Sequence, residues 1–221
     1  MTDSPMRYAM PFDPDCTRCP RLAGFLAQVR EAHPDYYARP VPAFGDPGAR
    51  LLIVGLAPGM HGANRTGRPF TGDFAGILLY QTLHRHRFAS LGESLSADDA
   101  LRLRDCRITN SVKCVPPENK PTNEEIRTCN GYLAVELAGL PAGAVILALG
   151  QIAHKAALQG LGLKPSGWPF GHNAMHLLPN GLRLIDSYHC SRYNTQTRRL
   201  TEAMFDAVIA HCRGLVDEPV A

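Results

Sequence analysis

Short apolar runs alternate along the chain with segments of helical periodicity. The runs at 51–56, 106–112 and 145–149 are each followed, within a few residues, by glycine or proline. Apolar runs of this length, bounded by such turn residues, are typical of buried strands. Apolar residues recur every three to four positions at 21–32, which predicts a helix there.

Capping signals predict the remaining helices. Asp73 and Ser96 are each suited to cap a helix, and Thr122-Asn-Glu-Glu125 has the form of a capping box. Gly160 is suited to close a helix that begins near residue 151. The helices predicted in this way cover residues 73–83, 96–103, 122–137, 151–159 and 195–212.

The alternation of strands and helices predicts the fold class. It indicates an α/β fold, a three-layer helix–sheet–helix sandwich with a mostly parallel central sheet. Pro179-Asn-Gly181 is a hairpin-like turn between two further strands, at 176–178 and 182–186. We find no internal repeat and no linker, so we expect residues 1–221 to form a single domain.

Composition narrows the class of protein. Apolar residues make up 45% and charged residues 19%, values typical of a globular protein in water. The apolar stretch 142–149 is too short to span a membrane, and the first residues lack the features of a secretory signal. We therefore expect a cytoplasmic protein in a reducing compartment. The net charge of +3 permits nucleic-acid binding but does not argue for it.

The segment from Gly55 to Asp73 carries the densest candidate chemistry. It holds five glycines and two prolines in nineteen residues, interleaved with polar, charged and aromatic side chains. In open α/β sheets, ligands bind in loops that follow strands, as this one does. The alternative is an ordinary long loop, but loops of this length without structure of their own are usually functional or disordered.

Four of the seven cysteines are placed to bind a metal. Disulfides are not expected in a reducing compartment. Cys16 and Cys19 form a C-x2-C pair, and Cys114 and Cys129 have fourteen residues between them. Four thiolates can hold zinc or an iron–sulfur cluster, and the spacing alone does not decide between them. The other three are interpreted as buried or incidental thiols: Cys106, Cys190 and Cys212.

These motifs together resemble those of the iron–sulfur uracil-DNA glycosylases. Gly55-Leu-Ala-Pro-Gly59 and Gly67-Arg-Pro-Phe-Thr-Gly-Asp73 resemble the first motif of family 5, the B type. The related family 4 has an acidic residue where this chain has Leu56. Ser187-Tyr-His-Cys-Ser-Arg-Tyr-Asn194 is similar to the His-Pro-Ser-Pro-x-Asn motif, with Cys190 and Arg192 at the usual proline positions. The resemblance covers nearly the whole chain.

The resemblance implies a monofunctional DNA glycosylase of base excision repair. Such an enzyme flips uracil out of DNA and hydrolyses its N-glycosidic bond, and it accepts other deaminated bases such as hypoxanthine. The implied cofactor is one 4Fe–4S cluster, and the implied partner is damaged DNA bound by a monomer. The implied cluster ligands are Cys16, Cys19, Cys114 and Cys129.

The resemblance also implies roles for individual side chains. Asp73 would orient water or stabilise the cationic sugar, and His189 would donate to the base O2 as negative charge develops there. The amide of Asn110 has a donor and an acceptor that match the edge of uracil, and Phe70 would stack on the base. The implied substrate-binding residues are Gly55, Ala57, Gly59, Phe70, Asn110, Ser191 and Asn194. The implied DNA-binding residues are Arg65, Arg68, Arg192 and Tyr193.

Two other classes of protein stay open. A redox or radical enzyme would need an open ligand position on the cluster or an electron partner, and four matched cysteines leave no open position. A non-catalytic iron–sulfur protein that binds nucleic acid would give no reason for Phe70, Asn110 and His189 to converge.

Overall fold

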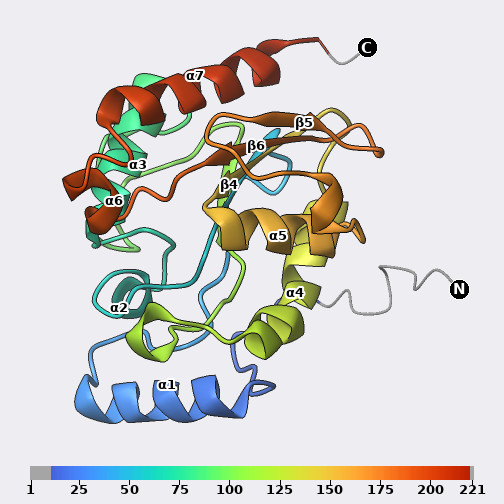
Figure 1. Ribbon diagram of the computed structural model, residues 1–221. Coiled ribbons are helices and arrows are strands. Elements are labelled where there is room, and N and C mark those ends of the chain that lie inside the picture. The colour runs from blue at the N-terminus through green and yellow to red at the C-terminus, as the bar shows by residue number, and fades with distance from the viewer. Residues whose placement is uncertain (1–10, 220–221) are drawn as a thin grey trace, which may run out of the picture.

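The computed structural model describes residues 11–219, and at their centre lies one sheet of six strands (Figure 1). The strands are β1 (Phe44–Gly45), β2 (Leu51–Gly55), β3 (Cys106–Asn110), β4 (Val145–Leu149), β5 (Met175–Leu177) and β6 (Arg183–Ser187). Their order across the sheet is β1-β3-β2-β4-β6-β5. The four inner strands are parallel, and the two edge strands are antiparallel to their neighbours.

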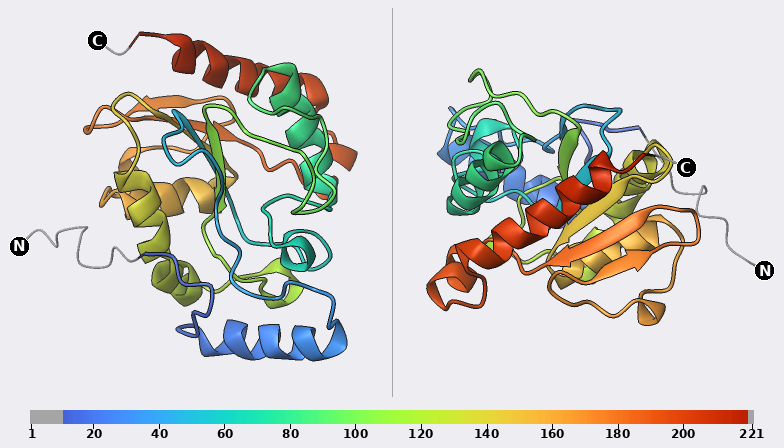
Figure 2. Two further views of the ribbon diagram at one scale, coloured as in Figure 1. Left: turned by 180° about the vertical axis from the view of Figure 1, so that it is seen from behind. Right: turned by 90° about the horizontal axis from the view of Figure 1, so that it is seen from above.

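Helices cover both faces of the sheet. They are α1 (Pro20–Ala32), α2 (Ala63–Thr66), α3 (Phe74–Arg85), α4 (Asn123–Ala138), α5 (Gln151–Gly160), α6 (Arg192–Gln196) and α7 (Glu202–Asp217). Figure 1 shows α3 and α7 on one side of the strands, and α1, α4 and α5 on the other. Viewed from above, α7 crosses the sheet obliquely (Figure 2). The predicted three-layer sandwich is confirmed.

Two hydrophobic cores, one on each face, hold the layers together. Along β2, Leu51 and Ile53 belong to the core with α3 and α7, whereas Leu52 and Val54 belong to the core with α1, α4 and α5. All four side chains are fully buried. Because strand side chains alternate between faces, a strand that is covered on both sides must be apolar throughout. This explains the continuous apolar runs in the sequence.

Most of the predicted elements are confirmed, with ends shifted by one or a few residues. Thr122 and Glu125 form the full capping box of α4, and Asp73 caps α3. The hairpin between β5 and β6 closes through Leu178, whose amide donates to Leu182 at 2.8 Å, and Gly181 has the positive φ of the turn. The strand β1 was not predicted, because two residues are too few to show a periodicity.

Two helix predictions are wrong. Residues 96–103 form no helix, because the Asp99 carboxylate accepts the backbone N–H groups of Leu95, Ser96 and Leu101, which fixes a loop. The helix predicted at 195–212 is instead divided into α6 and α7. Arg198 lies between them with φ of 58°, and α7 begins anew under the cap of Thr201, whose hydroxyl accepts from the amide of Met204.

The topology determines where a ligand can bind. The chain passes from β2 to β3 on one side and later returns to β4 on the other side of β2. The connections after β2 and β4 therefore leave in opposite directions, which opens a crevice at the carboxyl ends of the strands. Within residues 11–219 no helix is long and apolar enough to cross a membrane.

Candidate active site

A cavity of about 340 Å³ lies at the carboxyl edge of the sheet. It is formed by the segment after β2, the end of β3 and the loop after β6. Seven residues predicted from the sequence line it: Ala57, Gly59, Phe70, Asp73, Asn110, His189 and Ser191. Residues separated by more than a hundred positions in sequence are thus brought to one cavity.

Gly55 allows two of these side chains to approach the backbone. It ends β2 and pairs in register with Asn110 at the end of β3. A Cβ at Gly55 would collide with Oδ1 of Asn110 and would lie 2.8 Å from Cζ of Phe70. Only glycine therefore fits at this position, although Gly55 itself does not line the cavity.

Asn110 is buried with an unused acceptor. Asn110 is 3% exposed, and its Oδ1 has no hydrogen-bond partner among the described residues. A buried polar atom that stays unpaired costs about 1–3 kcal/mol. Since Asn110 lines the cavity, a ligand N–H is the natural partner for this oxygen.

Phe70 is held rigidly in an unusual conformation. Its φ is 56°, which is rare for an aromatic residue. The buried hydroxyl of Tyr80 donates to the carbonyl of Pro69 at 2.7 Å, and a Cβ at Gly76 would collide with the carbonyl of Phe70. The Phe70 ring lies 5.9 Å from the His189 ring, with 28° between the ring planes. The two rings form an aromatic wall of the cavity.

Asp73 both caps α3 and lines the cavity. Its Oδ1 accepts from the Gly76 amide at 2.9 Å. A Cβ at Gly62 would lie 2.7 Å from its Oδ2, so the other carboxylate oxygen lies against the glycine-rich backbone. Burial raises the pKa of Asp73, and hydrogen bonds from the Gly76 and Ala75 amides only partly oppose this.

His189 is electrically neutral at physiological pH. Burial lowers the pKa of its imidazole from 6.5 to about 4. The Nδ2 of Asn194 donates to the His189 carbonyl at 2.8 Å, so Asn194 supports the loop from outside the cavity. Ser191 lines the cavity and caps α6, its Oγ accepting from the Asn194 amide at 3.4 Å.

A buried polar network fixes β6 just before His189. The carboxylate of Asp186 lies 2.8 Å from Nδ1 of His154, and Nε2 of His154 lies 2.8 Å from the carbonyl of Trp168. The amide of Gly171 donates to the other oxygen of Asp186. Both Asp186 and His154 are buried. The sequence analysis did not find this network, because nothing in the spacing of these residues indicates that they meet.

The four residues predicted to bind DNA differ in their environment. Arg65, Arg192 and Tyr193 are exposed, and Tyr193 retains 71% of its accessible surface. Arg192 lies over the Phe74 ring at 4.9 Å. These three are accessible to DNA.

The assignment of Arg68 to DNA binding is wrong. The residue is only 4% exposed, and its guanidinium bonds to Asp99 at 2.6 Å and to Ser94 at 3.0 Å. It also donates to the carbonyl of Ala97 at 2.5 Å. The guanidinium is therefore occupied inside the protein, where it anchors the loop that was predicted as a helix.

Asn119 lines the cavity although no sequence signal indicated it. It lies in the loop after β3, where Glu118 and Asn119 both have positive φ, 54° and 57°. Positive φ at two consecutive residues other than glycine is uncommon. A loop conformation of this kind follows from the surrounding structure and not from a periodic pattern. The remaining lining residues are Leu56, Ala63 and Ala75.

The four predicted ligand cysteines line a second, small cavity: Cys16, Cys19, Cys114 and Cys129. The amide of Lys113 donates to Sγ of Cys129 at 3.2 Å. Burial raises the pKa of Cys19 to about 11 and also raises those of Cys114 and Cys129. No set of three His, Cys, Asp or Glu side chains within residues 11–219 is arranged to hold a single metal ion.

A family model described as the uracil DNA glycosylase superfamily matches residues 42–213. The chain belongs to this superfamily. A Type-5 uracil-DNA glycosylase from Thermus thermophilus is 51% identical, over 90% of this chain and 93% of its own. One from Pyrobaculum aerophilum is 41% identical, over 85% and 83%. A Type-4 uracil-DNA glycosylase of P. aerophilum is 38% identical over 58% of this chain and 57% of its own. The resemblance to family 5, with family 4 more distant, is confirmed.

We expect the His189 imidazole to titrate near pH 4. Between pH 6.5 and about 4 the unfolded chain binds a proton at this residue that the folded protein does not. His189 therefore contributes stability that is present above pH 6.5 and is lost as the pH falls toward 4. NMR titration of the ring nitrogens measures this, with His189→Gln identifying the resonance. A midpoint near 6.5 in the folded protein would contradict the burial argument.

Proposed function

We propose that this protein is a DNA glycosylase that removes uracil from DNA and leaves an abasic site. The observation that carries the proposal is the cavity in which Asn110, with its unpartnered Oδ1, meets Phe70, Asp73 and His189. The relatives named Type-5 uracil-DNA glycosylase support it. We also propose that the protein acts as a monomer.

Asn110 and Phe70 are suited to recognise the base. The Oδ1 of Asn110 would accept the N3–H of uracil while Nδ2 donates to O4. Cytosine presents the opposite pattern, an acceptor at N3 and a donor at N4, so the same amide orientation disfavours it. The Phe70 ring would stack on the base, an interaction worth about 1–3 kcal/mol per base. The base must leave the helix to reach this cavity.

His189 and Asp73 are suited to the bond-breaking step. When the bond between N1 and C1′ breaks, its electron pair goes to the base and the sugar becomes an oxocarbenium ion. A neutral imidazole N–H would donate to O2, where the negative charge collects. The Asp73 carboxylate would stabilise the cation and position a water, whose oxygen bonds to C1′ while its proton passes through Asp73 to the departing uracil anion. The raised pKa of Asp73 suits transient acceptance of that proton.

The same recognition extends to other deaminated bases. Deamination replaces an exocyclic amine with a carbonyl beside a ring N–H. In hypoxanthine, O6 and N1–H repeat the arrangement of O4 and N3–H in uracil. We therefore include hypoxanthine among the proposed substrates, with a different fit because the purine is larger.

We also propose that the four cysteines hold one 4Fe–4S cluster. Four thiolates in one cavity are the donor set that such a cluster takes. A cluster of four irons is larger than a single ion, so its ligands would lie farther apart than those of zinc. When bound, the cluster would crosslink the segment before α1, the loop after β3 and α4. Its role is structural, and no catalytic step above involves it.

Three substitutions separate the proposed roles. Asn110→Ala should lose uracil recognition most. Asp73→Asn keeps a capping side chain but removes the charge, so DNA binding should survive while cleavage slows. His189→Ala should slow cleavage by about a hundred- to a thousand-fold, the usual effect of losing one transition-state donor. Single-turnover kinetics on a uracil-containing duplex measure these effects. If both Asp73→Asn and His189→Ala cleave at the wild-type rate, the assigned pocket is wrong.

The purified protein should be brown and contain iron with little zinc. Cys114→Ser should lose iron and stability together, because removing one ligand disrupts the whole site. Cys212→Ser is the control and should keep its iron, since Cys212 is buried in α7 in the core on the opposite face of the sheet from the four ligand cysteines. Elemental analysis and the visible absorbance spectrum measure both. Stoichiometric zinc without iron would refute the cluster.

A further inference from the structure

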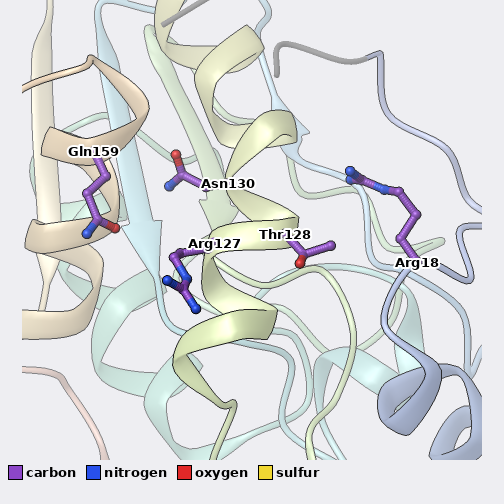
Figure 3. Close-up of a pocket in the computed structure, with 5 residues that line it drawn as sticks. All are labelled: Arg18, Arg127, Thr128, Asn130 and Gln159. Atoms are coloured by element: carbon purple, nitrogen blue, oxygen red, sulfur yellow. The ribbon is translucent and has the colours of Figure 1, made fainter. Parts of the chain in front are cut away.

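A second hollow lies on the outer surface of α4 (Figure 3). Its volume is about 620 Å³, and it is lined by Arg18, Arg127, Thr128, Asn130 and Gln159. In Figure 3 the side chains of Arg127 and Gln159 lie between α4 and α5, while Arg18 belongs to the segment on the other side of α4.

An adjacent hollow of about 440 Å³ extends the first one between the two helices. It shares Arg127 and Gln159 with the first and adds Asn123, Ile126, Ile152, Lys155 and Ala156. We call the two hollows together the α4–α5 groove.

The groove has the donor chemistry of a phosphate-binding surface. Its charged lining residues are Arg18, Arg127 and Lys155, and no acidic side chain of the described residues lines it. Of the two acids at the start of α4, Glu125 pairs with Arg21, and Glu124 is exposed but does not line the groove. The amides and the hydroxyl that complete the lining are further hydrogen-bond donors. Such groups supply most contacts to nucleic-acid backbones.

Arg127 and Lys155 are free to bind a ligand. Both residues are exposed, and neither forms an ion pair with any residue from 11 to 219. Ile152, which is 41% exposed, lines the same hollow as Arg127 and Lys155, which adds an apolar surface to the two charges. An alternation of cationic and apolar contacts matches the phosphates and sugars of a single strand.

The helices that form the groove begin near the base cavity. Gly150, the residue before α5, lies so close to the loop after β6 that a Cβ there would be 3.7 Å from Cβ of His189. Ile152 and Lys155 follow within the first two turns of α5. On the other side, Asn119 lines the base cavity, and α4 begins four residues later at Asn123. The amino-terminal ends of both helices, which carry partial positive charge, therefore lie near the cavity.

We propose that the α4–α5 groove binds the sugar–phosphate backbone of the DNA strand beside the excised nucleotide. Arg127 and Lys155 contact successive phosphates, and Ile152 lies against the sugar between them. The proposal rests on the proposed function, because it takes DNA as the ligand. It adds a binding surface away from the base pocket, on helices that contribute no residue to the chemistry.

Arg127→Ala and Lys155→Ala, singly and together, test the groove. Each removed phosphate contact should lower the slope of log Kd against log salt by about 1 and weaken binding about tenfold near 0.1 M salt. The probe is a duplex with a stable abasic-site analogue, followed by fluorescence anisotropy. Single-turnover excision at saturating enzyme should stay unchanged, because neither side chain reaches the base cavity.

The matched control is Arg104→Ala with Lys164→Ala, which removes the same charge. Both residues are exposed, one just before the amino end of β3 and the other beyond the carboxyl end of α5, at the edge of the sheet opposite the cavity. If the groove double variant and the control double variant bind alike, the groove proposal is overturned. If the groove variants show the expected loss of DNA binding and of salt slope but the wild type cleaves no uracil, the groove stands and the proposed function fails. A polyglutamate peptide is a second, acidic probe without phosphates. If the groove variants lose binding to this peptide but keep their binding to DNA, the ligand of the groove is not DNA.

Discussion

The pairing of β2 with β3 places Gly55 opposite Asn110, and the active site depends on the missing side chain at Gly55. The Asn110 amide and the edge of the Phe70 ring occupy the space that a side chain at Gly55 would need. The pairing of the two parallel strands thus positions the buried acceptor of Asn110 at the cavity. A larger residue at Gly55 would displace both groups that are proposed to hold the base.

Burial then sets the electrostatics of the two groups proposed for catalysis. It lowers the pKa of His189, which keeps the imidazole neutral, and raises the pKa of Asp73, which makes the carboxylate more basic. A neutral donor facing the departing base and a carboxylate facing the sugar are what charge separation in glycosidic cleavage requires. The same desolvation therefore serves both ends of the breaking bond. The α4–α5 groove, by contrast, keeps its charges exposed, as suits contacts with a solvated backbone.

The sequence predicted what local chemistry determines. Strands that are covered on both faces appear as apolar runs, and the capping residues Asp73 and Thr122 indicate where α3 and α4 begin. The family motifs indicated the residues that line the cavity. The predictions that failed concerned residues whose environment depends on partners far away in the sequence. Arg68 was assigned to the surface, but it is buried in an ion pair with Asp99. Likewise, the contact of His154 with Asp186 follows only from the packing of α5 on the sheet.

The most direct test of the central claim is uracil excision by Gly55→Ala, measured under single-turnover conditions beside Gly24→Ala. A Cβ at Gly24, in α1, would meet nothing within 4 Å, whereas at Gly55 it would strike Asn110 and Phe70. Circular dichroism would confirm that both variants are folded. We predict that Gly55→Ala loses about a hundredfold in rate, since small displacements of aligned groups have effects of that size, and that Gly24→Ala keeps the wild-type rate. A folded Gly55→Ala protein that excises uracil at the wild-type rate would contradict the account.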